Sequence, residues 1–311
     1  MRPRETELWQ QMSDGLQNCH QNAFPLPGVQ NDVQRNVYLQ QLVDSIRRVQ
    51  FVRVIAGRPI DPRRADGLSP MFDPIRAAVL NRRQGQFDEA CWLAFLFVHF
   101  GRHPVSKYRY VREFYSALGQ RPAWSFSAVA NDIAGMRAWL DANEDYLRRG
   151  SNRGFGNHRK YLSLSGSKSN ATGHAFETYV RWVRAYGDHE GLFAIAAHHA
   201  EGSPEKAFEW LYQSMRSVAS YGRIGRFDYL TMLQKLGLAD IRPGRAYLDA
   251  STRGPNKGAK LLLERTQPLT TSELERRVRI VGDYLGVGMQ EMEDSLCNWG
   301  KKPGVYKYFK G

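Results

Sequence analysis

The sequence predicts an all-α protein built as two packed helical lobes. Apolar residues recur three and four positions apart along most of the 311-residue chain, which is the spacing of a buried helix face. Glycine and proline separate these segments, and no convincing strand run is present. We expect an extended N-terminal arm over 1–30, helical lobes over 31–150 and 151–300, and a basic tail over 301–311.

The first lobe begins with a long helix. Tyr38, Leu42, Ile46 and Val49 form its apolar stripe, and Gly57 ends it. A loop rich in proline and aspartate follows this helix.

A segment over 89–98 is apolar on every side, which predicts the buried central helix of the lobe. Asp88 is expected to cap its start, and Cys91 is expected to be a small core residue. His99 is expected to cap the end of the helix, beside Gly101.

Two further helices complete the first lobe. One begins at Tyr108, and its arginines and tyrosines could hold a DNA backbone or line a half-exposed face. The other runs from Ser127 to Arg149.

The second lobe is predicted to consist of helices over 172–186, 188–200, 203–221, 271–285 and 289–298, with a glycine hairpin among them. Serine, proline and glutamate in succession mark the helix start at Ser203. The histidines of this lobe lack the spacing of a metal site and are expected to be structural: His189, His198 and His199.

The hairpin is expected at Gly222-Arg223-Ile224-Gly225-Arg226, with the helix after it ending at Gly237. Two glycines three residues apart let backbone N–H groups approach a phosphate at a helix N-terminus. This is the logic of helix-hairpin-helix DNA binding. A second glycine and proline turn over 252–260 carries Lys257 and is another expected phosphate contact. The tail over 301–310 could follow single-stranded or flipped nucleic acid, or be a frayed terminus.

The charge balance favours an anionic partner. Forty-four Lys and Arg against 31 Asp and Glu give a net charge of +13 and an isoelectric point near 9.7. Such an excess suits nucleic acid, an anionic surface or a phosphorylated substrate. No signal peptide or membrane-length apolar run is visible, so we expect a soluble protein of a reducing compartment.

Several classes of enzyme are excluded by missing motifs. The three cysteines, Cys19, Cys91 and Cys297, lie too far apart for a zinc ribbon or a disulfide framework. The serine-rich segment around Lys168 lacks a Walker A glycine pattern, which argues against a kinase. Rossmann, nucleophile-elbow and zinc-deaminase signatures are also missing.

The segment Gly154-Phe155-Gly156-Asn157-His158-Arg159-Lys160-Tyr161 is the strongest candidate for chemistry. It brings an amide, an imidazole, a guanidinium and an amine together. No Asp or Glu occurs between Tyr146 and Phe176, so the surroundings are cationic. Such a donor-rich loop suits phosphate or pyrophosphate, although a solvated basic connector would look the same.

Several segments together resemble one family, the α-glutamyl/putrescinyl thymine pyrophosphorylases of clade 3, also called amino acid:DNA transferases. The most specific are Asn157-His158-Arg159-Lys160-Tyr161 and Arg226-Phe227-Asp228-Tyr229-Leu230. Others lie at 41–48, 72–78, 97–101, 235–238 and 254–259, so that the resemblance covers about residues 25 to 300.

The resemblance implies a helical fold related to helix-hairpin-helix DNA glycosylases and a role in phage DNA hypermodification. A kinase first pyrophosphorylates 5-hydroxymethyluracil in double-stranded DNA. An amino acid such as glycine, or a polyamine, then displaces the pyrophosphate. The implied setting is the cytoplasm of a phage-infected bacterium, without a membrane partner. No cofactor is expected, although Mg²⁺ could assist the leaving group.

The chemistry of the side chains suggests roles in such a reaction. Arg159, Lys160 and Arg226 would neutralise the pyrophosphate, and either His158 or Asp228 would accept the proton of the amine. The remaining assignments are substrate binding by Asn157, Tyr161 and Lys235, and DNA binding by Gly222, Arg223, Gly225, Gly254, Lys257 and Gly258. The two segments around Asn157 and Arg226 would then face one pocket.

Two other functions fit the same residues. A DNA glycosylase would use an aspartate after the hairpin, such as Asp240 or Asp249. A non-catalytic DNA-binding partner of a modification complex would need only the cationic surface.

Overall fold

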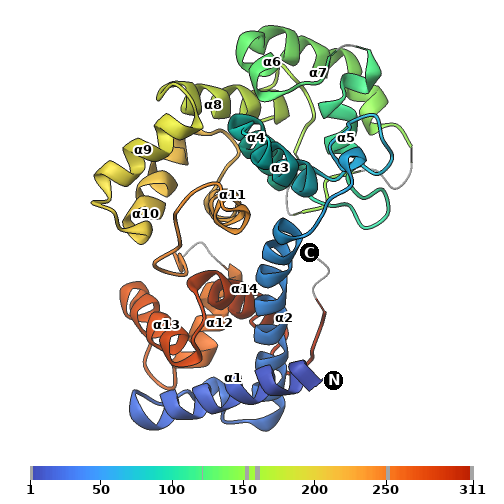
Figure 1. Ribbon diagram of the computed structural model, residues 1–311. Helices are drawn as coiled ribbons and strands as arrows, with labels where there is room; N and C mark the ends of the chain where they lie inside the picture. Colours follow the sequence, from blue (N-terminus) through green and yellow to red (C-terminus); the bar gives the residue numbers. More distant parts are fainter. Residues whose placement is uncertain (1–2, 121, 151–153, 158–161, 250–252, 309–311) are drawn as a thin grey trace. The chain divides into compact units, whose positions relative to one another are not determined.

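The computed structural model describes residues 3–120, 122–150, 154–157, 162–249 and 253–308 (Figure 1). Over these ranges the chain forms α-helices joined by short 3₁₀ helices and loops, without a strand, which confirms the predicted all-α class. The helices are α1 (Pro3–Asn22), α2 (Asp32–Gly57), α3 (Pro74–Arg83), α4 (Phe87–Phe100), α5 (Arg109–Tyr115), α6 (Phe126–Asn131), α7 (Ile133–Arg148), α8 (Thr172–Arg184), α9 (His189–His199), α10 (Pro204–Ser214), α11 (Arg223–Leu236), α12 (Arg253–Leu263), α13 (Thr271–Leu285) and α14 (Met289–Trp299).

Contacts group the chain into two compact units, and α2 continues from one into the other. Unit 1 takes in 1–52 and 243–310, and unit 2 takes in 53–242. Unit 1 is therefore built from segments that precede and follow unit 2 in the sequence. The arm, lobe and tail boundaries expected from the sequence stay predictions.

The expected extended arm is wrong in one respect, because most of it is helix α1. Met12, Leu16 and Cys19 are buried on one face of this helix, which packs against α13. Glutamine and asparagine dominate the rest of the segment and hide this sparse apolar stripe. Burial of the stripe against another helix stabilises a segment whose composition alone does not indicate a helix.

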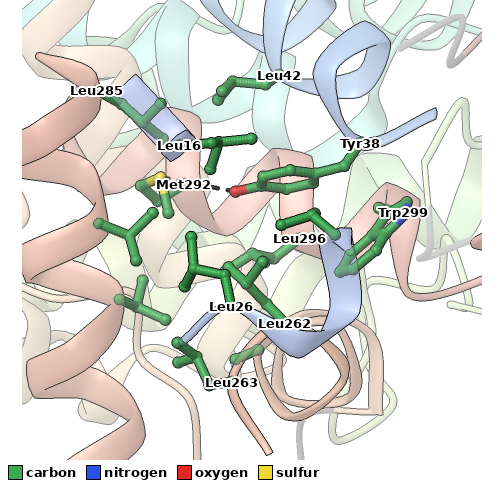
Figure 2. Packing of buried hydrophobic residues seen from close by; sticks show 14 of the residues in the cluster. Leu16, Leu26, Tyr38, Leu42, Leu262, Leu263, Leu285, Met292, Leu296 and Trp299 are labelled. Carbon is green, nitrogen blue, oxygen red and sulfur yellow. Dashed lines mark hydrogen bonds between the residues drawn. The ribbon is translucent and has the colours of Figure 1, made fainter. Parts of the chain in front are cut away.

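Unit 1 has a continuous apolar core (Figure 2). Tyr38 of α2 lies at its centre, with its ring 4.9 Å from that of Trp299 and its hydroxyl 4.0 Å from the sulfur of Met292. The stripe predicted for α2 is thus confirmed as a core face. The described part of the basic tail is bound to α2, since Gln41 donates to the carbonyl of Lys307 and the Tyr306 hydroxyl donates to Asp44.

The expected glycine and proline turn over 252–260 is wrong, because Gly254 and Gly258 lie inside α12. A Cβ on Gly258 would lie 2.2 Å from the carbonyl oxygen of Leu296, and one on Gly254 would lie 2.6 Å from the Cys297 sulfur. These glycines let α12 approach α14 closely, the usual effect of small residues four apart on a helix. Gly258 is also buried, so packing between helices accounts for it.

We predict that Gly258→Ala destabilises the protein by about 1–3 kcal/mol, because the added methyl group overlaps the α14 backbone. Gly304→Ala is the control, since a Cβ there meets nothing within 4 Å. Urea unfolding of both variants measures the difference. Equal stability of the two would contradict the packing described here.

Unit 2 is arranged around α4, which is buried along nearly its whole length as the sequence predicts. It packs against α3, α5, α6, α9 and α11. Trp92, Phe95 and Tyr179 form the aromatic centre, with 3.7 Å between the stacked rings of Phe95 and Tyr179. Cys91 is buried among them, as expected.

Two predicted helices of unit 2 are shorter in the structure. The segment over 127–149 divides into α6 and α7 at Asp132, whose extended backbone and side-chain bond to the Gly135 amide start a new helix. Helix α10 begins as predicted, with Ser203 accepting from Lys206, but it ends at Ser214. A 3₁₀ turn follows it.

A buried chain of hydrogen bonds joins four helices of unit 2. The Tyr179 hydroxyl lies 2.7 Å from that of Tyr229 and 2.6 Å from Nε2 of His189, whose Nδ1 contacts Asp88. His189 is therefore structural, as predicted. Burial lowers its pKa even though Asp88 raises it, so the folded protein keeps this imidazole neutral.

We predict that stability falls as the pH drops below about 6.5, the pKa of an unperturbed histidine, because the unfolded chain then binds a proton that folded His189 resists. His189→Gln should remove this part of the pH dependence and cost about 1–3 kcal/mol at neutral pH, through lost buried hydrogen bonds. Unfolding curves between pH 5.5 and 7.5 test both effects. His198→Gln, at an exposed position on the same helix, should keep the wild-type profile.

Candidate active site

The segment Gly154–Asn157 is attached to the C-terminal end of α4. Phe155 is buried, with its ring 5.6 Å from Phe100, 5.7 Å from His99 and 5.6 Å from Tyr110. The amide of Gly156 donates to the Phe100 carbonyl at 2.7 Å. Phe155 therefore belongs to the core of unit 2.

Glycine is required where this segment crosses the helix end. A Cβ on Gly156 would lie 2.1 Å from the carbonyl carbon of Arg102, so the two backbones touch. Gly101, which ends α4, has a φ of +69°, a value that side chains disfavour.

Asn157 caps α4 from outside the helix. Its side-chain nitrogen donates to the carbonyls of Val98 at 2.8 Å and His99 at 3.2 Å. These are among the last carbonyls of the helix, which lack partners inside it. The structure thus gives the Asn157 amide a role in holding the segment, while its expected role in substrate binding stays a prediction.

His158, Arg159, Lys160 and Tyr161 lie outside the described residues. The chain on their far side is anchored close to the same helix end. The Ser163 carbonyl accepts from the amide and the hydroxyl of Thr172, and that hydroxyl lies 3.1 Å from Nε2 of His99. Described residues on both sides of this stretch therefore contact His99 or its immediate partners.

His99 does not cap α4 as predicted. It is fully buried within the last turn, and Gly101 ends the helix. Its ring lies between Phe155, at 5.7 Å, and Tyr221, which stacks on it at 6.2 Å. The cap was predicted from the position of His99 near the helix end, but neighbouring segments cover the side chain.

The serine loop that follows is held firmly by α7. One carboxylate oxygen of Asp141 accepts from the Ser165 hydroxyl and from the amides of Gly166 and Ser167. Desolvation raises the pKa of Asp141, but these hydrogen bonds outweigh it and the pKa lies below its usual range. Arg137 donates to two carbonyls of the loop and pairs with Glu177.

The expected glycine hairpin is only partly present. Gly222 precedes α11 as its N-cap, but Gly225 lies buried in the first helical turn. The preceding residues are tied to the serine loop and α8, because Ser220 donates to the Asn170 carbonyl and the Ala219 amide donates to Thr178. The helix after the hairpin was expected to begin at Phe227. It begins four residues earlier, at Arg223, so Gly225 lies inside it.

Helix geometry separates the residues expected to act around Arg226. Arg226 donates to the Tyr212 carbonyl at 2.8 Å and lies 4.1 Å above the Tyr212 ring, against α10. Asp228 is two positions further, roughly 200° around the helix, so it points to another side. Lys235 lies nine residues from Arg226, roughly 14 Å along α11.

The prediction that the Asn157 and Arg226 segments face one pocket is untested. Their described neighbours do approach one another, because Phe155 and Tyr221 both contact the His99 ring.

A group of arginines beside this helix end was not identified from the sequence. Burial and the charge of Asp73 raise the pKa of the Tyr108 hydroxyl, and Arg102, Arg76 and Arg64 lie close enough to oppose this rise. The Arg102 guanidinium lies 6.0 Å from the Tyr108 ring centre. Arg76 also pairs with the buried Asp73 that caps α3. The segments that carry these arginines are distant in sequence, so only the fold brings them together.

Asn157→Asp is predicted to destabilise unit 2 by about 1–3 kcal/mol. It replaces a donor with an anion facing two carbonyl oxygens, at the helix end where negative charge is unfavourable. The matched control is Asn36→Asp, at an exposed position near the start of α2, which should change stability by less than about 0.5 kcal/mol. Thermal unfolding distinguishes them, and an unchanged melting temperature for Asn157→Asp would contradict the capping role.

Among the described residues, no group of three or more His, Cys, Asp or Glu side chains is placed to hold a metal ion. Nor is any described helix both long and apolar enough to cross a bilayer.

Comparison with known families identifies the chain. The model of the family described as alpha-glutamyl/putrescinyl thymine pyrophosphorylase clade 3 matches residues 33–311. The chain belongs to this family. No curated protein and no solved structure gives a match. Membership confirms the resemblance seen in the sequence and gives the chain a role in thymine hypermodification.

Proposed function

We propose that this protein transfers an amine to pyrophosphorylated 5-hydroxymethyluracil in double-stranded DNA. The observation that carries the proposal is the family match over 33–311. In the reaction a C–N bond forms at the 5-methylene carbon and the C–O bond to pyrophosphate breaks. Pyrophosphate leaves with the electron pair, and the attacking amine loses a proton. The amine is an amino acid such as glycine, or a polyamine.

The cationic segment after Asn157 is the proposed centre of the reaction. The described residues on either side of this segment are held by hydrogen bonds near His99. Asn157 bonds to α4, and Ser163 bonds to Thr172 of α8. In this proposal Arg159 and Lys160 neutralise the leaving group and His158 takes the proton of the amine, with Tyr161 and Asn157 at the substrate. A preorganised cationic site is the main device for stabilising a departing polyanion.

The structure of α11 changes the roles that we propose for its residues. Gly222 and Arg223 stand at a helix N-terminus without a side-chain cap, a position that favours a phosphate of DNA. Arg226, held on Tyr212, would add positive charge on the same helix turn. Asp228 and Lys235 point away from Arg226, which favours His158 over Asp228 as the base.

Fewer residues than expected remain as candidates for contact with the phosphates of DNA. Gly225, Gly254 and Gly258 have packing positions inside helices, as described above. Lys257 is exposed on α12 and is the member of that group suited to a phosphate. The arginines around Tyr108 are a further surface for the DNA backbone.

The test is incubation with DNA carrying pyrophosphorylated 5-hydroxymethyluracil and a pool of amino acids and polyamines. We expect pyrophosphate release and an aminomethyl-linked nucleoside, identified by mass analysis. Arg159→Ala should lower the rate by about 100-fold or more, as expected for a group that stabilises transition-state charge. Arg181→Ala is the control, since this exposed arginine pairs with Glu177 on α8.

Other outcomes point to other functions. Release of free base with an abasic site would indicate a glycosylase instead, with Asp240 or Asp249 as the residue to mutate. DNA binding without any change to the base would indicate a non-catalytic partner. Absence of pyrophosphate release with every amine would exclude the transferase.

A further inference from the structure

The residues between α4 and α5 form a tight turn with an apolar tip. The amide of His103 donates to the Lys107 carbonyl at 2.9 Å, and the Lys107 amide donates to the His103 carbonyl at 3.0 Å. Pro104 and Val105 are exposed at the tip, and Val105 has 60% of its surface open to solvent. The proposed function gives this turn no role.

Hydrogen bonds inside the turn hold its tip in one conformation. Nδ1 of His103 accepts from the amides of Val105 at 3.3 Å and Ser106 at 3.1 Å. Nζ of Lys107 donates to the Pro104 carbonyl at 2.7 Å. The ring of Pro104 also fixes a backbone angle at the tip. Because the turn is already ordered, a contact made through Val105 costs little conformational entropy.

The turn begins directly against the segment that leads into the cationic residues. A Cβ on Gly156 would lie 2.1 Å from the carbonyl carbon of Arg102 and 2.4 Å from the nitrogen of His103. Val105 is two residues beyond His103, so their Cα atoms lie within roughly 8 Å of one another. Successive bases of one DNA strand are roughly 3.4 Å apart along the helix axis. The tip therefore lies within a few base steps of Gly156.

Positive charge predominates beside the apolar tip. Arg102 is exposed just before the turn, and its guanidinium lies 6.0 Å from the ring centre of Tyr108, just after the turn. Arg64 and Arg76 lie close to Tyr108 as well, together with Asp73, which pairs with Arg76. Three arginines against one aspartate leave this place cationic. Duplex DNA matches both features, since it offers phosphates to the arginines and apolar base faces to the tip.

An apolar side chain among cations has a specific use on DNA. Enzymes that carry out chemistry on a base extrude it from the duplex, which breaks its stacking on both sides. Proteins that unstack bases insert an apolar side chain between them as a wedge. A single exposed apolar residue is ordinary on a protein surface. Val105 differs because it combines a rigid turn, neighbouring arginines and a position beside Gly156.

We propose that Val105 is a wedge that enters the base stack of duplex DNA and fills the space left by the extruded target base. Val105 is thus a positioning residue, and it takes part in no covalent step. This role rests on the proposed function, because it requires a base in duplex DNA as the substrate.

Fluorescence of 2-aminopurine tests the wedge. The probe is placed beside the target base in a duplex that carries pyrophosphorylated 5-hydroxymethyluracil, where it reports the loss of stacking. We expect wild-type protein to raise the fluorescence. Val105→Ala should reduce this rise at least about tenfold, because its methyl group is too short to replace a base in the stack. Val105→Leu keeps a large apolar side chain and should preserve the rise.

Val33→Ala is the matched control, since Val33 is a valine of similar exposure, 57%, on α2. It should leave the fluorescence rise unchanged. Val105 is exposed, so its replacement spares the core, and the melting temperature of each variant verifies the fold.

A target base placed opposite an abasic site distinguishes a wedge from a merely structural role. Such a base has no pairing partner to lose, so it needs less help to leave the stack. With Val105→Ala, the rate of pyrophosphate release should fall at least about tenfold on the paired target and less than about threefold on the unpaired one. Equal losses on both targets would overturn the proposal, as would a full fluorescence rise with Val105→Ala.

The fluorescence readout needs no transfer of an amine, so failure of the wedge and failure of the transferase are distinguishable. A wild-type rise that Val105→Ala abolishes, in a protein that releases no pyrophosphate, would support the wedge and count against the transferase. Pyrophosphate release from duplex DNA without a fluorescence rise would support the transferase and overturn the wedge. Absence of a rise with wild-type protein overturns the wedge in either case.

Discussion

Burial of α4 on every side is the constraint on which unit 2 depends. A helix surrounded by other helices has no solvent-exposed face, so each polar group at its ends must find a partner in the protein. At its start, Asp88 and Glu89 bind the backbone of α9 and α6. At its end, Asn157 binds the last carbonyls. The need to satisfy a buried helix thus brings distant segments of the chain to both of its ends.

The same constraint explains where the candidate chemistry lies. The chain on either side of the cationic segment is tied to the C-terminal end of α4 through Asn157, and to the start of α8 through Ser163 and Thr172. His99 lies between these attachments, covered by Phe155 and Tyr221. This buried aromatic and hydrogen-bonded cluster fixes the described residues on both sides of that segment, as the support of a binding site must.

Much of the fold follows from the sequence, because the apolar stripe of α2, the all-apolar α4 and the Ser203 cap are local signals. The failures have a common physical origin in contacts between distant segments. Gly254 and Gly258 looked like a turn because glycine is rare in helices, but the close approach of α14 requires them there. Gly225 also looked like part of a turn, but it lies buried in the first turn of α11. The arginines around Tyr108 have no local signature, since only packing brings their segments together.

Unit 1 is built from segments on both sides of unit 2 in the sequence, which has a consequence for synthesis. Helices α1 and α2 leave the ribosome before unit 2, whereas their core partners α12, α13 and α14 are made after it. Apolar residues of α1 and α2 therefore stay exposed to water or to chaperones while the ribosome adds roughly two hundred residues. Unit 2 has no such delay, because its segments are contiguous in the chain. Nascent unit 2 is thus complete while unit 1 still lacks half of its core.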